Sequence, residues 1–281
     1  EIYTMAIPYF EEAIQIATAA GREDIVNFAR VGLARAYLNI GGHEADVMRY
    51  AGEVPQDFAW WAYYELNSGE NNLYGDTHGE NHNVGVHPDF LNGEFGDTMI
   101  VATQTDPRVQ HTPNWSLGHN GLTQLYSPFQ GIRYSGFNGE TIANGGSPAE
   151  FDRVTDIQIA SGIEALHHYY EAAGPNGTGP AGTTLEFVNA RRAFGNQPPV
   201  DLSGEALMAE LREQRGKDFY LGGLRLGDLR RWVRQGVGPA NEIFPSGPHV
   251  NEQWGDYGTA TCFPLPLAEY EGNPNLENPH T

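Results

Sequence analysis

The sequence is poor in cysteine and in long apolar runs. Its 281 residues include a single cysteine, Cys262. That count excludes an internal disulfide and a cysteine-based zinc site. Cys262 lies in the apolar stretch TATCFPLPL, which predicts a buried structural thiol. No stretch reaches the roughly 20 apolar residues of a membrane span, and no signal peptide is visible at the start of the sequence.

Positive charge is also scarce. The chain has 16 Lys and Arg against 36 Asp and Glu, a formal net charge of -20. A nucleic-acid-binding protein needs a basic surface to neutralise phosphates, and docking on anionic lipid needs one too. We therefore expect no nucleic-acid partner, and we expect neutral or cationic partners instead.

The composition is otherwise that of a folded protein. The hydrophobic fraction is 40%, the charged fraction is 19%, and there are 35 glycines. These values exclude a disordered chain and a coiled coil. So many glycines without a repeat period indicate long, shaped loops on a folded scaffold, and the length suffices for one large domain or two small ones.

The first 54 residues predict helices with small residues at their contacts. Apolar positions at helical spacing indicate helices over 8–20, over about 22–40 and over about 43–54, with Gly21 and Gly41-Gly42 as stops. The region 8–54 has the look of a tetratricopeptide-like hairpin preceded by the second helix of another unit. Because a repeat unit cannot bury its apolar face alone, we expect further sequence upstream.

A second hairpin is predicted over about 155–195. Ile157–Ala173 is expected to be one helix and Thr183–Gly195 its partner, joined by a loop of Gly, Pro and Asn. The aromatic segment Phe58–Leu66 is interpreted as a strand or an extended segment. A further helix is predicted from about Gly204 to Tyr220.

The region of about 67–148 has little helical period and much Gly, Asn, Asp and aromatic residue. Its aromatic content argues against disorder, so it is interpreted as a loop-rich ligand face. Rings that stack on a sugar, with amides and charged groups nearby, suit carbohydrate recognition. The alternative is that each ring only anchors its loop to the scaffold. The candidate ligand-binding residues are Asn114, Trp115, Tyr126, Arg133 and Tyr134.

Two histidine-bearing segments are considered as ligand sites. The loop of Gly75–Asp97 offers Asp76, His78 and Glu80 as weak candidates for a metal, with calcium as the ion, against the alternative of a solvated acidic loop. No other cofactor is expected. The pair His167-His168 lies within a predicted helix, so the two side chains are expected on different faces with at most one in the core.

Motifs of catalysis are missing from the sequence. It contains no Gly-x-Ser-x-Gly, no phosphate-binding loop and no His-Glu-x-x-His. No carboxylate pair is marked by its sequence context as suited to glycoside hydrolysis. The chain is therefore predicted not to be an enzyme.

The sequence contains, in this order, the segments LARAYLNIG, TQTDPRV, LEFVNARRAFG, LREQRGKDFYLGGLRLGDLRRW and CFPLPLAEYEGNPNLENP. Together these five segments, in the expected order, resemble the SusD/RagB-like family of outer-membrane nutrient-binding lipoproteins. The N-terminal third of that family, with its lipidated cysteine, has no counterpart in this sequence.

The resemblance implies a mainly α fold with little β, in which long irregular loops pack on tetratricopeptide-like hairpins. It implies one domain over 1–281, with a C-terminal signature region over 204–281. It also implies a non-catalytic protein on the extracellular face of the outer membrane. Such a protein captures oligosaccharides or peptides and passes them to a TonB-dependent, SusC-like β-barrel transporter.

A different class of function stays open beside this one. Tetratricopeptide-like scaffolds present surfaces to other chains, so the chain could instead be a structural subunit of an extracellular homo-oligomer or polymer. The basic segment YLGGLRLGDLRRW is assigned a structural role in either case. Asp228 is expected to pair with Arg230 and Arg231, over packed leucines and Trp232.

Overall fold

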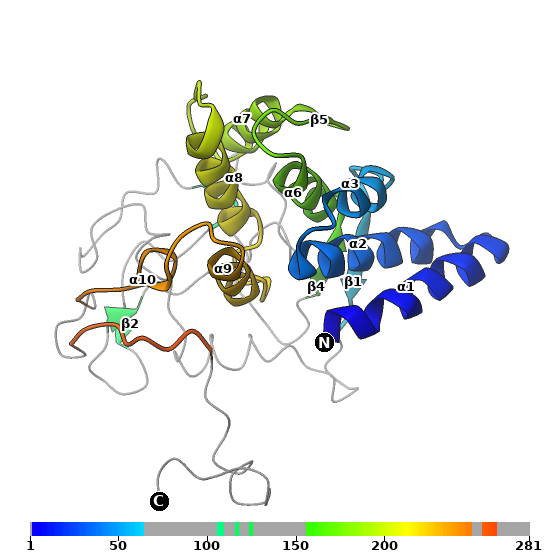
Figure 1. Cartoon of the computed structure of the whole chain (residues 1–281), viewed down its shortest axis with the longest axis horizontal. Helices are drawn as coiled ribbons and strands as arrows, with labels where there is room; N and C mark the ends of the chain where they lie inside the picture. The colour runs from blue at the N-terminus through cyan, green and yellow to red at the C-terminus, as the bar shows by residue number, and fades with distance from the viewer. Residues whose placement is uncertain are drawn as a thin grey trace, which may run out of the picture. The chain divides into compact units, whose positions relative to one another are not determined.

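The computed structural model describes residues 2–64, 106–109, 116–117, 124–125, 156–248 and 255–262 (Figure 1). The chain divides into two compact units, residues 1–225 and 226–281, and each is described by itself. The described residues are mainly helical, with three short two-stranded ribbons, so the predicted fold class is confirmed. The assignment of one domain to the whole chain stays a prediction.

The first three helices form the predicted antiparallel arrangement. They are α1 (Ile2–Ala19), α2 (Glu23–Ile40) and α3 (Glu44–Gly52). Helix α1 begins before Pro8, so its predicted start was too late. Gly32 of α2 lies under the ring of Phe10, with 2.6 Å from a Cβ built there to the nearest ring carbon, so only glycine permits this approach.

The core of this part is formed by α2, α3, the ribbon of strands β1 (Ala59–Ala62) and β4 (Ile157–Ser161), and the following helix α6 (Gly162–Ala173). Small residues on α2 let its neighbours approach closely, as the sequence predicted. Partly buried aromatic rings, among them Phe28 and Trp60, pack against this core. The buried residues of this core are Val31, Ala34, Leu38, Val47, Ala51, Val54, Ala160 and Ala165.

A two-stranded ribbon joins the first helices to α6. Strand β1 (Ala59–Ala62) pairs antiparallel with β4 (Ile157–Ser161), with a register irregularity between Trp60 and Trp61. The segment predicted as extended is therefore a strand in part. The prediction of helix from Ile157 was wrong, because the first five of those residues form strand β4 and four of them pair with β1.

Helix α6 starts only after that strand. The Ser161 hydroxyl accepts a hydrogen bond from the backbone N–H of Glu164 at 3.2 Å and so caps the helix. A Cβ at Gly162 would overlap the backbone carbonyl oxygens of Pro55 and Gln56. The chain before β1 thus packs directly on the start of α6.

The remaining helices of this unit are α7 (Thr184–Phe194) and α8 (Gly204–Asp218). A tight ribbon of β5 (Thr178–Gly179) and β6 (Gly182–Thr183) joins α6 to α7, and a capping box formed by Thr183 and Glu186 starts α7. The buried residues shared by these helices are Leu166, Tyr170, Phe187, Val188, Leu207, Met208 and Leu211.

The second unit contains most of α9 (Arg225–Arg234) and the short α10 (Ala240–Ile243). Arg231 is fully buried and bonds to Asp228 at 2.7 Å, as predicted. The predicted pairing of Asp228 with Arg230 was wrong, because Arg230 is exposed and lies on the opposite side of the helix from the buried pair. Cys262 is also exposed, which contradicts the predicted buried thiol: an apolar run in the sequence does not by itself bury a side chain, because burial depends on contacts in space.

One further ribbon lies between the two hairpin regions in the sequence. Strand β2 (Ser116–Leu117) pairs antiparallel with β3 (Gln124–Leu125). The described residues contain no helix long and apolar enough to cross a membrane.

Candidate functional site

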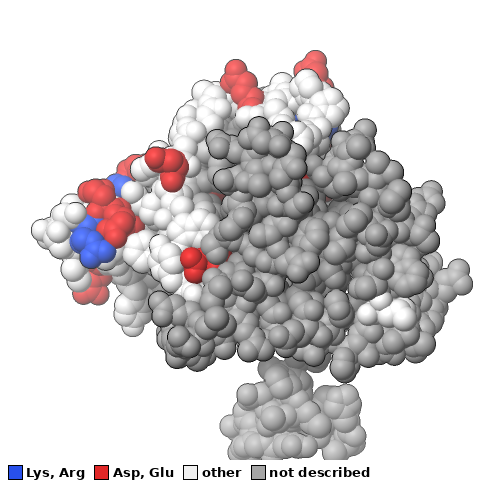
Figure 2. Space-filling view, turned by 180° about the vertical axis from the view of Figure 1, so that it is seen from behind, with Lys and Arg blue, Asp and Glu red and all other residues white. Residues whose placement is uncertain are grey.

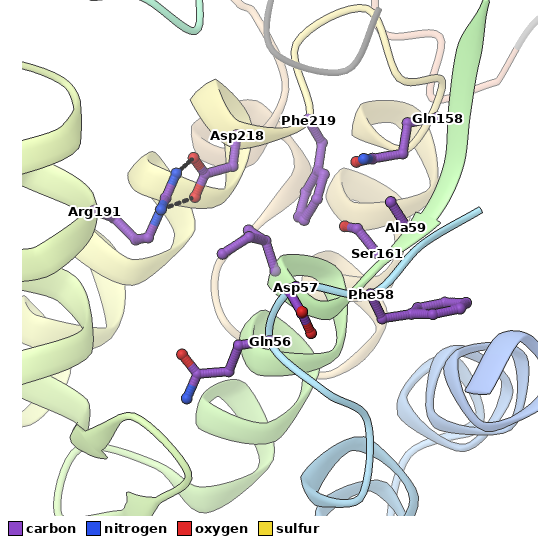
Figure 3. Close-up of a pocket in the computed structure, with 10 residues that line it drawn as sticks. Gln56, Asp57, Phe58, Ala59, Gln158, Ser161, Arg191, Asp218 and Phe219 are labelled. Carbon is purple, nitrogen blue, oxygen red and sulfur yellow. Dashed lines mark hydrogen bonds and ion pairs between the residues drawn. The ribbon is translucent and has the colours of Figure 1, made fainter. Parts of the chain in front are cut away.

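A pocket of about 150 Å³ lies in the first unit (Figure 3). It is enclosed by the segment before β1, by β4, by the start of α6, and by α7 and the end of α8. These elements are far apart in the sequence and are brought together by the ribbon and by the packing of α6 on α8. The lining residues are Gln56, Asp57, Phe58, Ala59, Gln158, Ser161, Ile163, Arg191, Asp218 and Phe219.

Burial separates the inner wall of the pocket from its rim. Arg191, Asp218 and Phe219 are 9%, 3% and 4% exposed, so they form the inner wall. Gln56 and Asp57 are exposed and form the rim. A molecule in the pocket would therefore enter past the rim and meet a charged pair and an aromatic ring inside.

The Asp218 carboxylate is the centre of a buried ionic network. Arg191 binds it with two hydrogen bonds, Nε to Oδ2 at 2.9 Å and Nη2 to Oδ1 at 2.7 Å. Arg108 donates to Oδ1 at 3.1 Å, and Nε2 of His167 lies 2.6 Å from Oδ2. Burial alone would raise the pKa of Asp218, but Arg191, His167 and Arg108 hold it far below its ordinary range. Asp218 is therefore a fixed acceptor and not a proton donor.

Arg108 ties a distant segment to this network. Its side chain is fully buried, and besides Asp218 it bonds to Asp106 through Nε at 2.8 Å and through Nη2 at 2.5 Å. Burial opposes the charge, yet the carboxylates of Asp106 and Asp218 raise the pKa of Arg108 above its ordinary value. Gly195 lies against this ion pair, and a Cβ there would overlap the Arg108 guanidinium.

A second buried network lies on the other side of α6. Glu164 accepts a hydrogen bond from Nε of Arg35 at 2.7 Å, and Nε2 of His168 lies 3.2 Å from the same oxygen. Nη1 of Arg215 lies 3.4 Å from Nδ1 of His168. Burial lowers the pKa of His168 to about 4, so the imidazole is neutral at pH 7.

Both histidines of the pair are in the core, so the prediction that at most one could be was wrong. His167 and His168 are each 0% exposed. Helix α6 is covered on two sides, and each histidine contacts a buried carboxylate: His167 contacts Asp218, and His168 contacts Glu164. Burial lowers the pKa of His167 as well, and its Nδ1 has no hydrogen-bond partner among the described residues.

The pocket presents hydrogen-bonding groups beside a ring. Gln158 and Ser161 come from β4, and the carboxylate of Asp57 has no hydrogen-bond or ion-pair partner among the described residues. In the view of Figure 3 the Phe219 ring stands between Asp218 and Gln158. Such an arrangement can hold a small polar molecule that also has an apolar face.

The residues that the sequence put forward as ligand-binding lie outside the described residues. This holds for Asn114, Trp115, Tyr126, Arg133 and Tyr134, although Trp115 directly precedes β2. The weak metal candidates Asp76, His78 and Glu80 lie outside them as well. Within the described ranges no group of three or more His, Cys, Asp or Glu side chains is placed to hold a metal ion.

Sequence reasoning did not propose the pocket residues as a site. Arg191 and Asp218 fall in segments that carry the family resemblance, which is a signal that could have found them. Asp57 and Gln158 carry no such signal, because 101 positions separate them and only the β1–β4 pairing brings them together. Comparisons with protein-family models, with curated proteins and with solved structures found no match to this chain.

Proposed function

We propose that the chain is a non-catalytic binding protein of the SusD/RagB-like kind. It captures oligosaccharides, or peptides, at the extracellular face of the outer membrane and passes them to a TonB-dependent transporter. One observation carries the proposal: three segments that resemble the family meet at a single buried carboxylate. Arg108 of TQTDPRV and Arg191 of LEFVNARRAFG both bind Asp218 of LREQRGKDFY.

That convergence gives the resemblance a physical reason. A buried carboxylate that binds two arginines depends on them, because Asp218 or Arg191 left alone would be an uncompensated buried charge. A resemblance by chance in three unconnected segments would have no reason to place its charged residues in one network. The tetratricopeptide-like helices of the same unit supply the scaffold expected of such a protein.

The electrostatics support binding without catalysis. The buried carboxylates of Asp218 and Glu164 are each engaged by arginine, and a strongly depressed pKa does not suit Asp218 to general acid catalysis. Figure 2 shows the face opposite to the view of Figure 1. Acidic side chains recur over the described part of this face, while basic ones gather mainly at one edge. With a net charge of -20, the surface favours neutral or cationic ligands.

The test is binding by the purified chain. Affinity gel electrophoresis against a panel of neutral polysaccharides should show retardation by at least one of them, with no release of reducing ends. A tagged chain should also retain a TonB-dependent transporter, identified by mass spectrometry, from solubilised outer membranes of its source organism. Failure of every glycan and every peptide pool to bind would refute the proposal, and glycan hydrolysis would refute its non-catalytic part.

One observation favours the structural alternative. Along α1 the side chains at Ile2, Met5, Tyr9 and Ile16 are 80%, 65%, 71% and 63% exposed, with the spacing of a helix-packing stripe. A second copy packed along this stripe would bury it. Light scattering across a concentration series should then show a dimer or polymer, and Met5→Glu should reduce it to a monomer.

A further inference from the structure

The ribbon beside the pocket carries aromatic rings on the face that the pocket uses. Trp61 lies directly opposite Gln158 in the β1–β4 pairing. Opposite residues of an antiparallel pair project from the same face of a sheet. Because Gln158 lines the pocket, Trp61 lies on the pocket's face of the ribbon. Trp60 belongs to the other face, where its ring stacks on Phe28 at 4.9 Å in the core.

Tyr63 continues this row away from the pocket. It lies two residues after Trp61, and the chain stays tied to the opposite strand because Tyr64 N–H donates to Asp156 at 3.0 Å. Alternation along an extended chain puts Tyr63 on the same face as Trp61. Its side chain is 72% exposed, and Trp61 is partly exposed. A large ring left this open has no role in the core.

The pocket itself has room for one small ring. Its volume is about 150 Å³, which corresponds to roughly five water molecules at ~30 Å³ each. The buried pair Arg191–Asp218 and the Phe219 ring close its inner end. A longer chain therefore cannot run through it, and only the end of a chain can enter.

We propose that the pocket receives the terminal ring of a neutral oligosaccharide and that Trp61 and Tyr63 stack on the rings that follow. The site rests on the proposed function. It adds to that function a location on the fold, a class of ligand and the recognition of one end of the sugar chain. Asp57 accepts hydrogen bonds from sugar hydroxyls at the rim. Ser161 can donate its hydroxyl proton, since its oxygen accepts from Glu164.

The charges around the pocket determine the ligand class. Among the described residues that line the pocket, Arg191 is the only cation, and Asp218 already binds it through both carboxylate oxygens. Asp57 adds an exposed negative charge at the rim. An acidic sugar would meet repulsion without a free cation, so the site favours uncharged rings.

The experiment is isothermal titration of the purified chain with oligosaccharides of one to six rings, cut from the polysaccharide that retards it most strongly. Affinity should rise up to about three rings, one in the pocket and one on each aromatic side chain, and then stay level. Tyr63→Ala and Gln158→Ala should each weaken binding about three- to tenfold, the range expected for one stacked ring or one hydrogen bond.

A matched variant separates a ligand contact from general damage. Tyr9→Ala removes an equally exposed tyrosine, 71% against 72%, from α1. It should leave the affinity unchanged, and circular dichroism should show that all three variants are folded. Because soluble oligosaccharides bind singly, a change of oligomeric state in Tyr9→Ala would not alter this measurement.

The possible failures are distinct. If the wild-type chain binds no glycan but binds a peptide pool, this site is refuted and the proposed function stands; if it binds neither, both are refuted. If it binds, but Tyr63→Ala and Gln158→Ala keep wild-type affinity while Trp115→Ala weakens it, the function stands and the ligand lies on the central loops. Affinity that keeps rising from four to six rings would refute recognition of a chain end.

Discussion

Replacing Asp218 by Asn is the sharpest test of the buried network. The substitution keeps the shape of the side chain but removes the charge that binds Arg191, Arg108 and His167. Arg108 keeps Asp106, whereas Arg191 loses its bidentate partner. The amide also brings a donor against groups that are themselves donors.

The expected loss of stability follows from the burial of these groups. The side chains of Asp218 and Arg108 are 1% and 0% exposed, and that of Arg191 is 11% exposed. Removing one partner of a buried pair costs about 3–5 kcal/mol, because the remaining charge is left without compensation. Domains of ordinary stability unfold at a cost of about 5–15 kcal/mol. The variant should therefore be folded, but its free energy of unfolding should be much smaller than that of the wild type.

Urea unfolding followed by circular dichroism measures this loss. With a slope of about 2–3 kcal/mol per molar urea, the midpoint should fall by about 1–2.5 M. Asp201→Asn is the matched control, since Asp201 is exposed between α7 and α8 and the chemical change is the same. Its midpoint should stay near that of the wild type.

A double variant tests whether the loss of stability in Asp218→Asn arises from the unpaired charge of Arg191. Asp218→Asn combined with Arg191→Gln removes both charges, so its loss should be smaller than the sum of the two single losses by about 1–3 kcal/mol. If Asp218→Asn unfolds at the same urea concentration as Asp201→Asn, the network does not stabilise the fold. The proposed function would then lose the observation that supports it, the network that joins three family-like segments.

Three further predictions concern the same unit. Gly195→Ala should destabilise by about 1–3 kcal/mol in urea, because the new methyl group meets the Arg108 guanidinium. Burial lowers the pKa of His168 from 6.5 to about 4. The stability that depends on the neutral imidazole is therefore fully present above pH 6.5 and is lost as the pH falls toward 4, by up to about 3 kcal/mol. His168→Gln should flatten the acid side of a plot of urea midpoint against pH. Thr183→Ala should lower the thermal midpoint through the loss of about 1 kcal/mol of helix capping.

Each of these has a control in the chain. Gly227→Ala adds the same methyl group where nothing lies within 4 Å of it, so it should not destabilise. Ser203→Ala removes an N-cap residue whose side chain makes no capping hydrogen bond, so it should be nearly neutral. For the histidine, an unchanged pH profile in His168→Gln would show that its protonation does not control acid stability. Equal effects of a variant and its control would refute the contact named for that variant.

Local patterns predicted the helices well. Glycine stops at Gly21 and at Gly41-Gly42 placed the ends of α1 and α2, and all of these glycines have positive φ angles in the structure. The hairpin character followed from small residues at close contacts, such as Gly32 under Phe10. These features depend on neighbours within a few turns, so the sequence displays them directly.

Strand β4 shows where that reasoning failed. Its apolar residues Ile157, Ile159 and Ala160 fit a helix that continues into α6, and nothing nearby in the sequence contradicts one. Pairing with β1, almost 100 positions earlier, makes the segment a strand. Long-range pairing of this kind overrides local propensity.

The sequence by itself determined the helical class, the ends of the first helices and the acidic character of the surface, because each follows from composition or from neighbours in the chain. Only the tertiary structure decided that His167 and His168 are both buried, since each depends on a carboxylate that packing supplies. The same is true of the pocket. Asp57, Gln158 and Asp218 become one site only when the ribbon and helices fold together, because burial and partners are properties of three-dimensional neighbours.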